Sequence, residues 1–391
     1  MKNSRLLAVL LILLAVPAFI FATSEKETSG DKDIKAGFIY IGPTGDYGWT
    51  YAHEVGRQYV MEKFPWLESV IVESVDEGDS ARFIDRLVQA ENCDIVFTTS
   101  FGYMDATVEA GAKYPDTIFM HCSGYKQTEN VGTYMGDLYQ MYYLNGLMAG
   151  ALTESNKIGY VAAFPIPELF RHINAFAMGI KATNPDARVY VKWLNAWYGP
   201  DQAREAAEAF IAEGCDVLAF TEDSPAVVEV GQEHMEAGDT VYTFSHYSPM
   251  QAYGEDSVVS GQLIDWGIMY EKTLKDLHDG VWTSEPLWWL AAEKAAKLGG
   301  AVDEPINPKF AGALKAITVD TPDLGNISVY DLVMKRYAQM QASPVEFEPY
   351  TGPIYDNTGK LQMVEGETPD VAYLESIMYY VDNVVGVIPS E

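Results

Sequence analysis

The chain has 391 residues, of which 48% are hydrophobic and 21% charged, so it can bury a sizeable core and is long enough for two domains. Its formal net charge is −30, and so acidic a surface repels phosphate backbones, anionic lipid headgroups and nucleotide di- or triphosphates. Nucleic acid and the lipid surface are therefore not expected as partners, and the sequence has neither a GxxxxGK[ST] loop nor a GxGxxG motif to overrule that charge argument.

The N-terminus has the layout of a secretory signal peptide. Lys2 and Arg5 precede an apolar run from Leu6 to Phe21, and small and polar residues follow. We expect residues 1–22 to be the signal peptide, with cleavage near Ala22 and a periplasmic or secreted product. The apolar run has 16 residues, fewer than the roughly 20 of a spanning helix. An uncleaved anchor is the alternative.

The polar stretch 23–33 is predicted to be a flexible leader, and strands then alternate with helices. This alternation predicts a parallel α/β sheet rather than an antiparallel sandwich. In the first half, the apolar patterns predict strands at 35–41, 70–75, 94–99, 117–123 and 131–135, and helices at 50–64, 79–90 and 104–113. The segment 138–153 is apolar on nearly every side, with Gly146 and Gly150 allowing close approach, so we expect a buried helix that connects two lobes.

The second half repeats this alternation. It predicts strands at 157–164, 188–195, 216–220, 240–245 and 258–264, and helices at 168–182, 200–213, 225–237 and 267–278. Beyond Trp282 the pattern weakens, and we expect a strand at Trp288 and Trp289 and helices at 329–340 and 371–384. The predicted domains are lobe one, at 34–127 plus about 266–345, and lobe two, at 128–265 plus about 346–391.

Matching residues indicate an internal repeat with an offset of 122 residues between the two halves, and chance similarity of two βα openings is the alternative. Five pairs of identical residues keep this offset: Lys35 and Lys157, Gly37 and Gly159, Pro43 and Pro165, Cys93 and Cys215, Asp94 and Asp216. A duplicated half-sheet gives two similar lobes with the carboxyl ends of their strands facing one another. Open α/β sheets bind ligands outside those ends, so we expect a ligand cleft between the lobes.

The residue types needed for metal or nucleophilic chemistry are not arranged in any recognised pattern. The six histidines are scattered without an HExxH motif, and there is no GxSxG elbow. The three cysteines are odd in number and are expected to be reduced and packed, with a disulfide as the alternative. We therefore predict no catalytic residues, no metal, no cofactor and no enzyme activity.

Aromatic and polar residues gather just beyond the predicted strand ends, where a cleft between lobes would lie. Aromatic rings can stack on a flat ligand, and Asn and Asp can fix its orientation. The candidate ligand-binding residues are Trp49, Phe101, Tyr103, Phe164, Asn195, Trp197, Tyr198, Asp223, His246 and Trp266. For each aromatic residue among them, packing in the core is the alternative.

At these residues the sequence resembles the basic membrane protein family, the purine-nucleoside-receptor-like branch of periplasmic substrate-binding proteins. The segments that carry the resemblance are GDYGWTYAHEVGR, TTSFGYMDATVE, KIGYVAAFPIPELFRHINAFAMG, NAWYGPDQAREAAEA, TEDSPA and VDNVVGVIP. The family implies a type I periplasmic binding fold, with two doubly wound parallel-sheet lobes joined by a multi-strand hinge. It also implies a monomeric receptor that hands a purine nucleoside or base to an ABC permease.

The resemblance also implies roles for individual residues. Trp49 and Phe101 would stack on the ligand from lobe one, Phe164 and Trp197 from lobe two, and Asp223 would accept hydrogen bonds from a base. The aromatic loop before Trp49 differs from the smaller polar residues of nucleoside receptors and favours a bare base such as adenine. The alternative is a secreted hydrolase or a sensor domain on the same fold, because a fold does not dictate a function.

Overall fold

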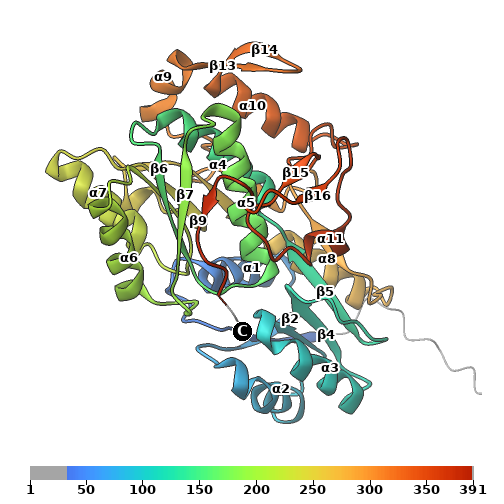
Figure 1. Cartoon of the computed structure of the whole chain (residues 1–391). Coiled ribbons are helices and arrows are strands. Elements are labelled where there is room, and N and C mark those ends of the chain that lie inside the picture. The colour runs from blue at the N-terminus through green and yellow to red at the C-terminus, as the bar shows by residue number, and fades with distance from the viewer. Residues whose placement is uncertain (1–32, 390–391) are drawn as a thin grey trace, which may run out of the picture.

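The computed structural model describes residues 33–389, which form two α/β lobes (Figure 1). The first lobe contains a six-stranded parallel sheet in the order β11-β5-β4-β3-β1-β2. Its strands are β1 (Ile34–Ile39), β2 (Leu67–Val72), β3 (Ile95–Thr98), β4 (Ile118–Cys122), β5 (Val131–Gly136) and β11 (Leu287–Trp289).

Both faces of this sheet are covered by helices. The helices of the first lobe are α1 (Trp49–Lys63), α2 (Ser80–Gln89), α3 (Met104–Lys113) and α8 (Gly267–His278). Successive residues of β1 point to opposite faces, as a strand requires: Phe38 packs with α1 and α8, and Ile39 packs with α2 and α3. The sheet is therefore doubly wound, as predicted.

The second lobe repeats this architecture around the strands β17-β7-β6-β8. Its elements are β6 (Lys157–Ala162), β7 (Arg188–Trp193), β8 (Val217–Thr221), β17 (Val384–Val385), α4 (Tyr139–Leu152), α5 (Pro167–Thr183), α6 (Pro200–Ala212) and α7 (Ala226–Ala237). A parallel bridge from Val217 to Tyr242 continues the sheet into β9 (Thr243–Tyr247), β10 (Val258–Ile264) and β12 (Ala296–Leu298).

The strand registers agree with the internal repeat. In the first lobe Gly37 of β1 pairs with Val96 of β3, and in the second lobe Gly159 of β6 pairs with Leu218 of β8. Both differences, 159 − 37 and 218 − 96, equal the predicted offset of 122. The two central strand pairs are therefore equivalent in space as well as in sequence.

The helices α4 and α5 pack more closely than any other pair because two glycines meet at their crossing. A Cβ atom on Gly146 would lie 2.1 Å from the carbonyl oxygen of Phe176, and one on Gly179 would lie 2.1 Å from that of Tyr143. Only glycine permits this approach, which explains why α4 is buried on nearly every side.

Three chain segments cross between the lobes, as a multi-strand hinge requires. They run from β5 to α4, from β10 to α8, and from β11 to β12. The predicted lobe boundaries are wrong at two places. The strand β5 belongs to the first lobe because it pairs with β4, whereas β12 belongs to the second lobe because it pairs with β10.

The segment after β12 also lies on the second lobe. It contains α9 (Pro308–Ala316), the hairpin β13 (Thr318–Thr321) and β14 (Gly325–Ser328), and α10 (Val329–Met340). The helices α9 and α10 pack on α4 rather than on the first lobe. The helix predicted at 329–340 is confirmed.

The helix predicted at 371–384 is wrong. It ends after one turn as α11 (Val371–Leu374), which follows the short hairpin of β15 (Ile354–Tyr355) and β16 (Leu361–Met363). Beyond it the chain is held in a non-helical path, because Asn174 of α5 accepts from the backbone N–H of Val381 and Asn383 donates to the carbonyl of Ala177. The chain then pairs as β17 with β7, on the second lobe.

The three cysteines, at 93, 122 and 215, are free and buried, as expected. Among residues 33–389, we find no helix with the length and apolar character needed to cross a membrane. The predicted signal peptide and nearly all of the predicted leader lie outside the described residues.

Candidate functional site

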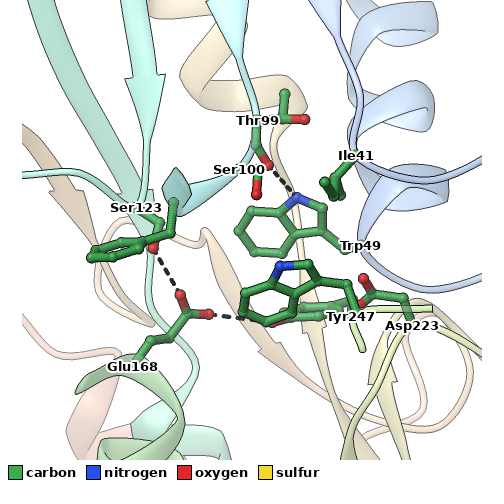
Figure 2. Close-up of a pocket in the computed structure, with 10 residues that line it drawn as sticks. Ile41, Trp49, Thr99, Ser100, Ser123, Glu168, Asp223 and Tyr247 are labelled. Carbon is green, nitrogen blue, oxygen red and sulfur yellow. Dashed lines mark hydrogen bonds between the residues drawn. The ribbon is translucent and has the colours of Figure 1, made fainter. Parts of the chain in front are cut away.

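A cavity lies between the lobes at the carboxyl ends of their strands (Figure 2). Its empty volume is about 290 Å³, and we call it the central cavity. The side chains around it come from segments that follow β1, β3 and β4 in the first lobe and β6, β7 and β8 in the second, and from the last residue of β9. They are Ile41, Trp49, Thr99, Ser100, Phe101, Ser123, Glu168, Trp197, Asp223 and Tyr247.

Trp49 is held in one orientation by the start of α1 and by its neighbours. Buried Asp46 satisfies the first turn of the helix, since its carboxylate accepts from the backbone N–H groups of Gly48, Thr50 and Tyr51. The Trp49 indole Nε1 donates to the carbonyl of Thr99 at 2.6 Å. The ring also packs edge-on against Tyr247, with centroids 5.0 Å apart, so its position is fixed from both lobes.

Trp197 forms the facing part of the second lobe. Its ring packs against Phe164, with centroids 4.9 Å apart, and its carbonyl accepts from the backbone N–H of Asp223 at 2.9 Å. Both aromatic rings are half-buried. This hydrogen bond joins the loop after β7 to the loop after β8. The Trp197 indole and the Asp223 carboxyl group therefore line the same cavity.

Asp223 is 97% buried at the point where the two lobes touch. A Cβ atom on Gly48 would lie only 2.6 Å from the Cα of Asp223, and the Ser248 hydroxyl donates to the Gly48 carbonyl at 3.2 Å. These contacts join a loop of the first lobe to two loops of the second. The structure is therefore a closed form of the two lobes.

Several carboxyl groups beside the central cavity are buried. Burial raises the pKa of Asp223 well above its usual range, and the nearby Asp46 and Glu222 raise it further. Burial also raises the pKa of Asp46 to about 6, against the lowering effect of its backbone N–H partners, and that of Glu222 to about 7. The neutral form of Asp223, which can both donate and accept a hydrogen bond, is therefore favoured.

Glu168 lies across the cavity from Asp223 (Figure 2). It is buried in the first turn of α5. The Ser123 hydroxyl of the first lobe donates to its Oε2 at 2.8 Å, and the Tyr247 hydroxyl of the second donates to its Oε1 at 3.2 Å. Both donors have left-handed backbone conformations, with φ of 66° and 60°, at the ends of their strands.

Two neighbouring cavities each share three lining residues with the central one. An outer cavity of about 860 Å³ shares Ile41, Trp197 and Asp223 with it and extends over Phe164 and Tyr198. A third, of about 350 Å³, shares Phe101, Ser123 and Glu168 with it and reaches Arg171, Trp288 and Glu375. The central cavity is the smallest of the three and is the one at which the aromatic rings of both lobes meet.

The structure brings together six of the ten predicted ligand-binding residues. Trp49, Phe101, Trp197 and Asp223 line the central cavity, and Phe164 and Tyr198 line the outer cavity.

The other four predicted residues do not line either of these cavities. Tyr103 is in the core of the first lobe, because a short 3₁₀ turn directs its hydroxyl to the carbonyl of Val75. His246 points into the second lobe and contacts Tyr142, because side chains alternate along β9. Asn195 is exposed in a left-handed turn after β7.

Trp266 supports the site from behind. It is fully buried and stacks on His53, with centroids 4.4 Å apart, and it packs edge-on against Trp49 at 5.2 Å. It therefore holds Trp49 in place without lining the central cavity.

The prediction missed Ser123 and Glu168. A glutamate directly after Pro167, at the start of a helix that follows a buried strand, was an available signal for Glu168. No such signal marked Ser123, because its hydroxyl meets Glu168 only when the lobes are closed. Within residues 33–389, no group of three or more His, Cys, Asp or Glu side chains is arranged to hold a metal ion.

Comparisons with known proteins agree with this architecture. Residues 34–305 match the family described as ABC transporter substrate-binding protein PnrA-like. A purine-binding protein of Brucella abortus is 32% identical over 361 residues, which cover 92% of this chain and 95% of that protein.

A second relative is named for a different ligand. A Haloferax volcanii protein named "Putative ABC transporter glucose-binding protein TsgA13" is 44% identical over 265 residues, which cover 68% of this chain. The match spans 65% of that relative's length. Among solved structures, a solute-binding protein of an ABC transporter system from Aeropyrum pernix superposes with a TM-score of 0.63 at 16% identity, covering 80% of this chain and 88% of that one.

Proposed function

Because the chain belongs to the PnrA-like family of ABC transporter substrate-binding proteins, we propose that it binds a purine base between its lobes and delivers it to an ABC permease. The proposed location is outside the cytoplasmic membrane, after removal of the predicted signal peptide. The proposed working form is a monomer, since one chain supplies both walls of the central cavity.

One observation carries the ligand class: the central cavity is lined by a tryptophan from each lobe and by two buried carboxyl groups at opposite ends. A planar ring bound there would stack on Trp49 and Trp197. Burial of about 200 Å² of aromatic surface, at about 25 cal/mol per Å², would contribute roughly 5 kcal/mol before the costs of binding. Hydrogen bonds must supply the remainder for micromolar affinity.

The hydrogen-bonding groups of the cavity favour a ligand that brings N–H donors. The hydroxyl groups of Thr99, Ser100, Ser123 and Tyr247 already donate to acceptors within the protein, and so does the Trp49 indole N–H. The oxygens of Glu168 and Asp223 keep further lone pairs for a ligand. The residues that line the central cavity include no Lys or Arg, which disfavours anionic ligands, including nucleotides.

The proposed mechanism is a population shift between open and closed forms. A ligand that stacks on both Trp49 and Trp197 contacts both walls only when the lobes are closed, so its affinity for the closed form is greater. The same closure forms the Ser123–Glu168 and Ser248–Gly48 hydrogen bonds between the lobes. A permease could then distinguish the loaded receptor from the empty one by its shape.

A sugar is the second candidate. The Haloferax relative is named for glucose, and an indole face with carboxylate acceptors also suits a sugar ring. A hexose, however, carries hydroxyl groups on most of its ring carbons and needs several donors from the protein, whereas the side-chain hydroxyls and the indole N–H around the central cavity are largely engaged within the protein.

Thermal unfolding with a panel of ligands tests this proposal. Adenine and guanine are expected to raise the melting temperature in proportion to their affinity, and glucose to leave it unchanged. Each ligand should be recovered chemically unchanged after incubation. Stabilisation by glucose alone would favour the sugar, and conversion of a purine to a product would favour the hydrolase alternative.

A further inference from the structure

Glu168 is placed where its side chain can contact a bound ligand. It is 94% buried, yet its carboxylate lies on the wall of the central cavity, opposite Asp223. Its two hydroxyl partners come from different lobes, Ser123 from the first and Tyr247 from the second. Each of its two carboxyl oxygens accepts one of these bonds and keeps a second lone pair, so Glu168 can accept a further hydrogen bond from a ligand.

The two ends of the cavity offer different hydrogen-bonding patterns. Burial raises the pKa of Asp223, so its neutral carboxyl presents a donor beside an acceptor. This pattern matches an edge of a heterocycle that carries an amino group beside a ring nitrogen, as the pyrimidine edge of adenine does. The end at Glu168 matches a plain N–H donor, which a free purine base carries on its five-membered ring.

We propose that Glu168 is a specificity-determining residue that accepts a hydrogen bond from the ring N–H of a free base, so that the receptor selects bases over their N9-substituted nucleosides. This inference rests on the proposed purine-binding function. In a nucleoside that nitrogen carries the ribose and has no hydrogen, so Glu168 would lose its donor and remain a buried, desolvated carboxylate. Discrimination by a missing hydrogen-bond donor is strong because the buried acceptor is left unpaired.

The test compares adenine with 9-methyladenine, which lacks the ring N–H at the same position, by titration calorimetry. Wild-type protein is expected to bind adenine at least about 10-fold more tightly, because 9-methyladenine leaves a buried acceptor without its hydrogen bond. In Glu168→Gln the ratio of the two affinities is expected to fall below about 3-fold, because a neutral amide leaves a smaller penalty when unpaired.

Ser123→Ala is the matched control. It removes the bond between the lobes but keeps the Glu168 carboxylate, so the absolute affinities can change while the ratio stays at about 10-fold or more. Equal binding of adenine and 9-methyladenine by wild-type protein would overturn this inference without any variant. The inference would also be overturned if Glu168→Gln showed the same ratio of adenine to 9-methyladenine affinity as the wild-type protein. The shape of the cavity alone would then account for the preference for the free base. Wild-type protein that binds neither of these compounds nor guanine would overturn the proposed function as well.

Discussion

The substitution Trp197→Ala tests the second-lobe wall of the central cavity. The Trp197 ring lines both the central and the outer cavity and is supported by Phe164 at a centroid distance of 4.9 Å. Stacking of a base on an aromatic side chain contributes about 1–3 kcal/mol. Its removal should therefore weaken adenine binding by about 5- to 150-fold.

Titration calorimetry with adenine measures this loss, and Tyr198→Ala is the matched control. Tyr198 is the next residue in the chain, is 45% exposed and lines the outer cavity only. Its removal should change the affinity by less than about 3-fold, which corresponds to the small effect of most surface substitutions. If Trp197→Ala bound adenine within about 2-fold of wild type, stacking on this ring would contribute nothing and the reasoning would be refuted.

Three further predictions concern closure, pH and the core. Gly48→Ala places a Cβ 2.6 Å from the Cα of Asp223 in the closed form. Calorimetry should therefore give at least about 10-fold weaker adenine binding, while the melting temperature of the ligand-free protein should change little. Unchanged affinity would contradict the closed geometry. Burial in this structure raises the pKa of Asp46 to about 6 and that of Asp223 well above its usual range. If separation of the lobes exposes these carboxyl groups, the closed form binds protons more tightly, and adenine affinity should be highest near pH 5 and fall as the pH rises to 8. Asp223→Asn should reduce this slope, and a slope equal to that of wild type would exclude Asp223 as its source. Gly146→Ala should lower the free energy of unfolding by about 1–3 kcal/mol in a denaturant titration, because its Cβ would lie 2.1 Å from the Phe176 carbonyl oxygen. A variant as stable as the wild-type protein would contradict the tight crossing of α4 and α5.

The sequence alone predicts the fold well because its dominant signals are local. The apolar patterns of the strands and the 122-residue offset specify two wound sheets, and the observed pairing of Gly37 with Val96 and of Gly159 with Leu218 keeps that offset. The boundaries between the two lobes could not be predicted from these patterns. Whether β5 and β12 join the first or the second sheet depends on how the chain crosses the hinge, which no local pattern encodes.

The candidate site could be predicted only in part, for a related reason. Asp223 could be predicted because it lies two residues beyond the end of β8, and Trp49 because it begins the helix that follows β1, on the side of the sheet where parallel sheets bind ligands. Tyr103 follows a strand end as well, but one 3₁₀ turn sends its hydroxyl to Val75 and away from the cavity. Glu168 and Ser123 acquire their roles only when opposite lobes meet, and that contact between distant segments leaves no periodic signal.

Titration of wild-type protein with adenine and with glucose, in parallel calorimetry experiments, tests the central claim most directly. The account predicts that adenine binds one site per chain with micromolar or tighter affinity, and that glucose gives no binding heat. Saturable binding of glucose with no binding of adenine would contradict it, because the two tryptophans and the two carboxyl groups would then hold a sugar rather than a flat nitrogenous base.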